Sequence, residues 1–228
     1  MGDRLQGVKK ISGFEVEWAG TPNCWRGRGG RVPVAIVNHI TDGLMPGCLL
    51  WMQNPQAGVS ANYLVTKDGR ILQLVKDEDT AWANGVVNKP SWTLYDGTNP
   101  NRYTISIEHE GMAGDQLTES QYQATLWLHR RLAEKYAIPL DEDHIIGHYR
   151  IDSVNRPNCP GPGFPWKRLM EDLKGENSEM AEVRVIVKGK EIPGVIINDR
   201  AWVPVRDIVE ALENRVEWDG NTRTVIVS

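Results

Sequence analysis

The stretch His144–Phe164, HIIGHYRIDSVNRPNCPGPGF, decides how the chain is interpreted, because it places two histidines and a cysteine in one short segment. Its many Gly and Pro residues exclude a long helix, and the two isoleucines before Gly147 predict a short buried strand that runs into a shaped loop. His148 then lies at the end of that strand, and Cys159 lies in a Cys-Pro-Gly turn. Imidazole nitrogen and thiolate sulfur are ligands that zinc prefers. A tetrahedral site therefore needs another histidine from elsewhere in the chain.

A second strand supplies a candidate for that histidine. Arg31–His39 (RVPVAIVNH) contains a continuous apolar run, which is typical of a central strand covered on both faces, and His39 falls where the run ends. A lone histidine in such a position is ordinarily a hydrogen-bonded core residue, and that alternative stays open. If His39, His148 and Cys159 converge, three protein ligands leave the fourth position of one zinc ion for water or substrate, as in catalytic sites.

A third strand ends in a carboxylate. Tyr103–Glu108 (YTISIE) alternates, so Glu108 points to the face opposite Ile105 and Ile107, whereas His109 points the other way. A glutamate at a strand end is usually solvated, but beside a metal it would take a proton from water and pass it to the leaving nitrogen of an amide. Spacing alone does not secure this site, since five histidines allow several other trios.

The remaining pattern predicts an α/β fold with a central mixed sheet flanked by helices. Asp68-Gly69 between two apolar runs predicts a hairpin. Thr118–Tyr136 is the clearest helix, with Gln121 completing a capping box and leucines every four residues; His129 is expected to pack within it. Residues 40–60 are predicted as loop, and Trp166–Leu173 as a short closing helix.

Three segments are predicted along the chain. Residues 1–173 form the zinc-site domain, 174–181 a polar linker, and 182–228 a small α+β domain that lacks His and Cys. In the small domain, β-rich runs are expected at 183–187, 195–197, 202–205 and 224–227, with a helix at 206–213 and turns at 188–190 and 219–221.

Composition excludes several classes of protein. A net charge of −4 argues against a nucleic-acid partner, and no apolar run is long enough to span a membrane. Three scattered cysteines are too few for a disulfide scaffold. The first residues lack an apolar leader, so we expect synthesis in the cytoplasm without a signal peptide. The oligomeric state stays open.

Several segments together resemble one family, the zinc-dependent N-acetylmuramoyl-L-alanine amidases of the type-2 class, which include phage endolysins and share their fold with the peptidoglycan recognition proteins. The matching stretches are AIVNHIT (35–41), SANYLVTKDGRILQLV (60–75), DTAW (79–82), SIEHEG (106–111), LTESQY (117–122) and IIGHYRID…NRPNCPGPGF (145–164). The resemblance implies zinc at His39, His148 and Cys159 and a catalytic role for Glu108. It also implies hydrolysis of the amide between N-acetylmuramic acid and the L-alanine of the stem peptide.

Two departures from the family pattern bear on the site. Many members carry a histidine after DTAW, where this chain has Ala83-Asn84, and many carry a lysine two residues before the last ligand, where it has Pro157. Arg156 is the candidate for stabilising the oxyanion, with a surface arginine as the alternative. Nine tryptophans suit a groove that stacks on sugar or peptide, although core packing explains most of them. Trp82, Trp92 and Asn62 are the candidate substrate-binding residues.

The tail over 189–227 resembles stalk modules related to the amino-terminal domain of copper amine oxidases. Without His or Cys it has no evident copper site, and wall attachment or dimerisation is the expected role. The resemblance implies a bacteriolytic hydrolase, a phage or prophage endolysin that acts on cell-wall peptidoglycan after release from the host cytoplasm. A host lytic enzyme is not separated from this by the sequence. The alternative is a non-catalytic protein that binds peptidoglycan, against which the presence of Cys159 argues.

Overall fold

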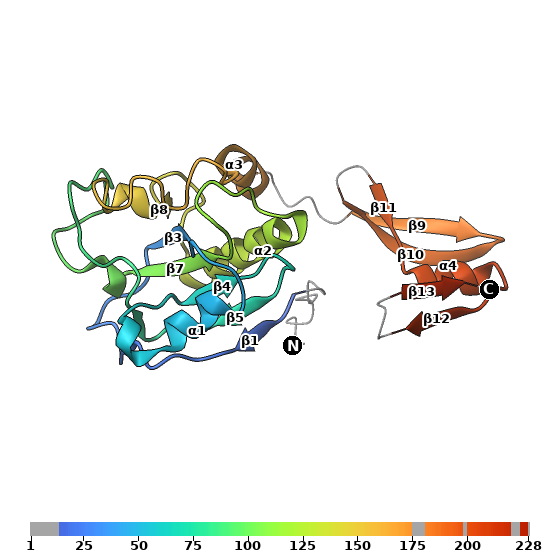
Figure 1. Cartoon of the computed structure of the whole chain (residues 1–228). Helices are drawn as coiled ribbons and strands as arrows, with labels where there is room; N and C mark the ends of the chain where they lie inside the picture. Colours follow the sequence, from blue (N-terminus) through green and yellow to red (C-terminus); the bar gives the residue numbers. More distant parts are fainter. Residues whose placement is uncertain (1–13, 175–180, 198–199, 220–223, 228) are drawn as a thin grey trace, which may run out of the picture. The chain divides into compact units, whose positions relative to one another are not determined.

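The computed structural model describes residues 14–174, 181–197, 200–219 and 224–227, which fall into two compact units. The first unit is Met1–Lys174 and the second is Gly175–Ser228. All the residues predicted for the site lie in the first unit, which contains the larger sheet and the long helix (Figure 1). Within the described ranges, no helix is long and apolar enough to cross a membrane.

The first unit is built on a six-stranded sheet with the order β1-β5-β4-β7-β3-β8. The strands are β1 (Val16–Trp18), β3 (Ala35–Ile40), β4 (Tyr63–Val65), β5 (Ile71–Gln73), β7 (Thr104–His109) and β8 (Ile145–Gly147). Only β4 and β5 pair antiparallel, as the predicted hairpin requires, and the other neighbours are parallel. The sheet is therefore mixed, and the predicted fold class is confirmed. A separate two-stranded ladder joins β2 (Cys24–Trp25) to β6 (Thr80–Ala81).

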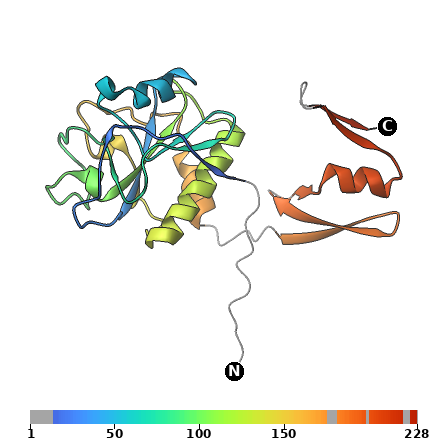
Figure 2. The same ribbon diagram turned by 90° about the horizontal axis from the view of Figure 1, so that it is seen from below.

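The two faces of the sheet are covered by different helices, because side chains alternate along each strand. On one face, Ile36, Ile105 and Ile107 pack with α2 (Glu119–Tyr136) and α3 (Trp166–Lys174). On the other face, Leu64 and neighbouring leucines pack with α1 (Gly47–Gln53). Figure 2 shows α1 and α2 on opposite sides of the strands.

Helix α1 lies in the segment predicted to be loop, so that prediction is wrong. Two of its residues, Cys48 and Met52, are buried four positions apart, which is the spacing that places side chains on one face of a helix. The segment is short, and a helix of this length is stabilised by packing rather than by its own propensity.

Helix α2 begins where the sequence predicts. The Thr118 side chain accepts a hydrogen bond from the Gln121 N–H (3.1 Å), but the Gln121 amide does not return to the cap. It donates instead to the main-chain oxygens of Val65 (3.0 Å) and Glu110 (2.9 Å), because both carbonyls are buried beside the helix start. His129 is buried within the helix, with Nδ1 2.8 Å from the Thr125 carbonyl oxygen, as expected for a packing residue.

The described residues of the second unit form a three-stranded antiparallel sheet, one helix and a two-stranded ladder. Its elements are β9 (Ala181–Val187), β10 (Lys190–Ile197), β11 (Arg200–Trp202), α4 (Val205–Ala211), β12 (Val216–Asp219) and β13 (Thr224–Val227). The turn predicted at 188–190 joins β9 to β10. Val205 begins the helix rather than ending a strand, and β12 was not predicted. Most of the predicted linker (175–180) and part of the predicted turn at 219–221 lie outside the described residues.

Candidate metal centre

Three neighbouring parallel strands end beside one another and carry the predicted site. In the ladder of β3 and β7, His39 lies directly opposite Glu108. Strand β8 pairs with the other edge of β3 as far as Gly147, opposite Asn38, and His148 follows immediately. The carboxyl ends of parallel strands in an open α/β sheet are where ligands ordinarily bind. The sheet order thus brings together side chains that are far apart in the sequence.

The His39, His148 and Cys159 side chains converge closely enough to share one ion. Their candidate ligand atoms all lie within 4.8 Å of one another, and Cys159 Sγ is 3.9 Å from His39 Nδ1. A tetrahedral zinc ion separates a nitrogen from a sulfur ligand by about 3.6 Å. The two imidazole rings lie edge to face, with centroids 4.6 Å apart. Two nitrogens and one sulfur in this geometry fit zinc with one position open.

The protonation of the trio suits metal binding. Burial lowers the pKa of His39 well below its usual value, and His148 adds to the effect. Burial, with Arg156 nearby, lowers the pKa of His148 to about 4. Burial and then the Glu108 carboxyl raise the pKa of the Cys159 thiol to about 12. The imidazoles are therefore neutral ligands, and a metal would displace the thiol proton as it binds.

Main-chain contacts hold the loop that carries Cys159. Its carbonyl accepts from the Tyr149 N–H (3.1 Å), and its own N–H donates to the Arg156 carbonyl (3.2 Å). A Cβ at Gly163 would lie 2.3 Å from the main-chain oxygen of Asp115, so only glycine allows the loop to approach that segment.

Asn84 lies behind the two histidines. Its side chain favours protonation of His39 and its main chain favours protonation of His148, which is how hydrogen-bond acceptors raise an imidazole pKa. Asn84 is fully buried and is held by hydrogen bonds from its N–H to Asn101 Oδ1 (2.7 Å) and from Nδ2 to Thr104 Oγ1 (2.8 Å). Its Oδ1 and both histidine Nε2 atoms are buried and have no hydrogen-bond partner among the described residues. No local sequence pattern marks Asn84, and the sequence did not predict this role.

Glu108 contributes a carboxyl group with a buried oxygen. Its Oε2 is buried and has no hydrogen-bond partner in the described part of the chain. Burial raises its pKa to about 8, and the Arg156 guanidinium opposes the rise. A carboxyl with a pKa near neutrality can both accept and donate a proton at physiological pH.

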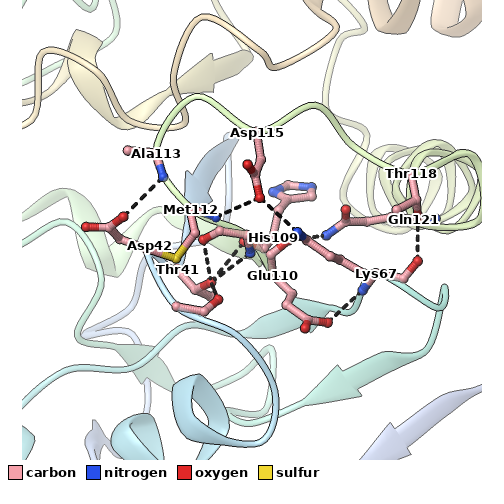
Figure 3. A network of polar contacts seen from close by, with 12 residues as sticks. Thr41, Asp42, Lys67, His109, Glu110, Met112, Ala113, Asp115, Thr118 and Gln121 are labelled. Carbon is pink, nitrogen blue, oxygen red and sulfur yellow. Dashed lines mark hydrogen bonds and ion pairs between the residues drawn. The ribbon is translucent and has the colours of Figure 1, made fainter.

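Figure 3 shows the polar network that holds the segment after β7. The Glu110 carboxylate accepts from the main-chain N–H groups of Met45 (3.0 Å) and Lys67 (2.7 Å). The Lys67 ammonium pairs with Asp115 (2.8 Å), whose carboxylate also accepts from the Met112 N–H (3.0 Å). These contacts join the segments that follow β3, β4 and β7, so the end of β7 that carries the site is fixed from several sides.

A cavity of about 510 Å³ opens over the trio and reaches Glu108 and Trp82. Arg156 also lines it, whereas two of the predicted substrate-binding residues do not. Trp92 is only 3% exposed and stacks on Tyr103, with ring centroids 5.5 Å apart. The prediction for Trp92 is wrong, because its ring packs in the core against the apolar part of β3 that precedes His39.

The prediction for Asn62 is also wrong. Asn62 is 1% exposed, and both its N–H and its Oδ1 pair with the main chain of Ser106 at 3.1 Å. The residue thus extends the contact of β4 with β7, because a side-chain amide can replace a main-chain partner at the start of a strand.

Comparison with known proteins agrees with this geometry. Residues 29–162 match the model of the N-acetylmuramoyl-L-alanine amidase family. The chain belongs to this family. Residues 180–228 match the copper amine oxidase N-terminal domain. The first unit is called the amidase unit below.

Individual relatives show the same likeness. N-acetylmuramoyl-L-alanine amidase A of Achromobacter lyticus is 30% identical over 161 residues, which are 62% of this chain and 83% of that protein. The 1,6-anhydro-N-acetylmuramyl-L-alanine amidase AmpD of Salmonella typhimurium is 37% identical over 112 residues, or 49% of this chain and 55% of AmpD. A crystal structure of a selenomethionine AmpD derivative has a TM-score of 0.57 at 27% identity and covers 70% of this chain and 94% of its own.

Proposed function

We propose that this amidase hydrolyses the bond between N-acetylmuramic acid and the L-alanine of the stem peptide, with one zinc ion held by His39, His148 and Cys159. The observation that carries the proposal is that two neutral imidazoles and one thiol converge on a single point. Beside them lies the Glu108 carboxyl, whose Oε2 has no hydrogen-bond partner among the described residues. When bound, zinc would polarise the amide carbonyl, make a water molecule more acidic and favour the ionised form of Glu108.

Glu108 moves the proton in the proposed reaction. Its Oε2 accepts a proton from the water whose oxygen attacks the carbonyl carbon. The same carboxyl then gives that proton to the alanine nitrogen as the carbon–nitrogen bond breaks. The products are the lactyl carboxyl group of the sugar, which then loses its proton to solvent, and a free α-amine. The buried position of Oε2 supports this role, because no described group competes for it.

Arg156 is proposed to stabilise the negative charge that develops on the carbonyl oxygen. It lines the cavity, and its charge acts on Glu108 and on both histidines. Guanidinium donors in a partly closed cavity stabilise an oxyanion more than they would in water. Arg156 directly precedes Pro157, which stands where many family members carry a lysine.

We further propose that the substrate is intact wall peptidoglycan, reached after release from the cytoplasm as by a phage or prophage endolysin. The second unit supports this, since a separate module is suited to attachment to an insoluble polymer. The 1,6-anhydro substrate class in the name of AmpD is the competing possibility. Parallel assays on purified sacculi and on soluble anhydromuropeptides separate the two.

The decisive experiment pairs zinc content with release of new L-alanine amino termini from a defined muramyl peptide. The wild type is expected to hold one zinc per chain and to release amine, and Cys159→Ala to lose both. Full zinc content in Cys159→Ala would refute the ligand assignment. Zinc without amine release would favour the second candidate, a protein that binds peptidoglycan without cleaving it.

A further inference from the structure

Aromatic side chains are concentrated on one wall of the cavity. Trp51 from α1 is 58% exposed and lines the cavity together with Val59 and Trp82. Helix α1 buries Cys48 and Met52 against the sheet, whereas Leu50 (60% exposed) and Trp51 lie on its outer side, so the Trp51 ring does not contribute to the core. A surplus of exposed aromatic surface beside a catalytic cavity marks a binding surface.

A third tryptophan extends this wall beyond the cavity. Trp25 is 43% exposed and packs against Trp82, with ring centroids 5.6 Å apart and planes inclined by 55°. The ladder of β2 and β6 fixes this pair, because Trp25 lies opposite Thr80, two residues before Trp82. The Arg102 guanidinium lies over the Trp25 ring, 5.8 Å from its centre. Trp51, Trp82 and Trp25 are called the tryptophan platform below.

The opposite wall has a different chemistry. There the loop that ends in Cys159 contributes Asn155, Arg156 and Asn158 to the lining. The sheet order separates the two walls, since α1 packs over β4 and β5, whereas the loop follows β8 at the other edge. The metal trio and Glu108 therefore lie between an aromatic wall and a polar, positively charged wall.

The scissile amide also separates two unlike parts, a sugar strand and a peptide that ends in carboxylates. We propose that the tryptophan platform binds the glycan strand on either side of the muramic acid, and that the stem peptide runs along the wall that contains Arg156. The inference rests on the proposed amidase function and adds the direction in which the substrate lies.

Physical chemistry favours sugar over peptide on the platform. The faces of pyranose rings carry C–H groups that stack on indole, and two tryptophans in contact offer a surface longer than one sugar ring. The platform is continuous with the cavity, so a strand bound on it would place its lactyl amide at the trio. Charge complementarity places the peptide carboxylates on the other side, beside Arg156.

The test compares substrates that share one dipeptide but differ in glycan length: muramyl dipeptide, and a tetrasaccharide carrying the same dipeptide. The measured quantity is the ratio of kcat/KM for the tetrasaccharide to that for muramyl dipeptide. Trp25→Ala and Trp51→Ala are each expected to lower this ratio about tenfold through KM, in line with the contribution of one aromatic contact. Trp18→Ala is the matched control, because Trp18 is 59% exposed in the same unit and does not line the cavity.

Several results would overturn the inference. An unchanged ratio in both platform variants would exclude glycan binding there. A loss that grows with the length of the stem peptide at fixed glycan length would assign the platform to the peptide. A similar loss in Trp18→Ala would indicate a nonspecific effect. A wild type that cleaves neither substrate refutes the proposed function itself, which is a different outcome from active variants with an unchanged ratio.

Discussion

His39 and Glu108 are direct partners in the parallel ladder of β3 and β7, so the proposed metal ligand and the proposed proton-transfer residue lie side by side on two buried strands. Their side chains lie on the same face, because paired residues of adjacent strands point the same way. The separation of the two groups is therefore set by the sheet and not by a flexible loop. The proposed function assigns metal binding and proton transfer to different residues, so mutation can test the two roles separately.

Glu108→Gln is expected to lower kcat by about 100-fold or more while zinc content stays at the wild-type value. Glutamine preserves the shape of the side chain but cannot accept the proton of the attacking water. Amine release from a muramyl peptide and metal analysis of the same sample check this. Glu119→Gln, an exposed glutamate at the start of α2, is the control and should retain full activity. Lysis by Glu108→Gln at the wild-type rate would remove Glu108 from the mechanism.

Strand ends were the part of the site that the sequence could predict. Apolar runs and alternation located β3, β7 and β8, and side chains at the carboxyl ends of parallel strands meet by geometry. His39, Glu108 and His148 follow from that rule once the strand order is known. The order itself comes from the structure, since nothing local in the sequence specifies which strands are neighbours, and before it only the family resemblance indicated that these side chains meet.

Residues whose role depends on three-dimensional surroundings were not predictable. Tryptophan and asparagine are residue types that also line binding clefts. Here, however, Trp92 faces the core and Asn62 pairs with a neighbouring strand. Asn84 follows a short strand in an irregular segment, so no periodicity indicates which way its amide points. The sequence did not predict that Trp51 lines the cavity, because α1 is too short for a clear helical pattern.

Asn84→Ala is expected to weaken zinc binding by about 10- to 100-fold, the usual effect of removing a polar group that supports a ligating histidine, because the Asn84 side chain acts on the pKa of His39. Competition with a chromophoric chelator measures the dissociation constant without reference to activity. The visible spectrum of the Co²⁺-substituted protein should also change, because the imidazoles lose their orientation. Asn62→Ala is the matched control: it is an equally buried asparagine outside the cavity, and it should lose stability but keep wild-type zinc affinity. Equal affinities in the two variants would leave Asn84 a purely structural residue.

Trp92→Ala is expected to destabilise the amidase unit by about 3–5 kcal/mol without changing KM, because a large buried ring is replaced by a cavity. The ring stacks on Tyr103, and its Nε1 donates to the Asp143 carbonyl oxygen (2.8 Å). Urea unfolding gives the stability, and kinetics on the folded fraction give KM. A raised KM with unchanged stability would restore Trp92 to the substrate site.

His129 should make the metal-free protein less stable in acid. Burial lowers the pKa of this histidine from its ordinary 6.5 to about 4 in the folded chain. Between these values the unfolded chain binds a proton that the folded chain does not, so stability falls as the pH falls from about 6.5 to about 4. The full effect is about 3 kcal/mol and is complete below the folded pKa.

His129→Gln removes this contribution, because glutamine does not titrate. The variant is expected to start less stable at pH 7, since the contact of Nδ1 with the Thr125 carbonyl oxygen is altered. Its further loss of stability between pH 7 and pH 4 should nevertheless be about 3 kcal/mol smaller than that of the wild type. Urea unfolding of both metal-free proteins at the two pH values measures the difference. Identical pH dependence would mean that His129 is protonated without cost in the folded protein, and that its burial is not tight enough to exclude the charge.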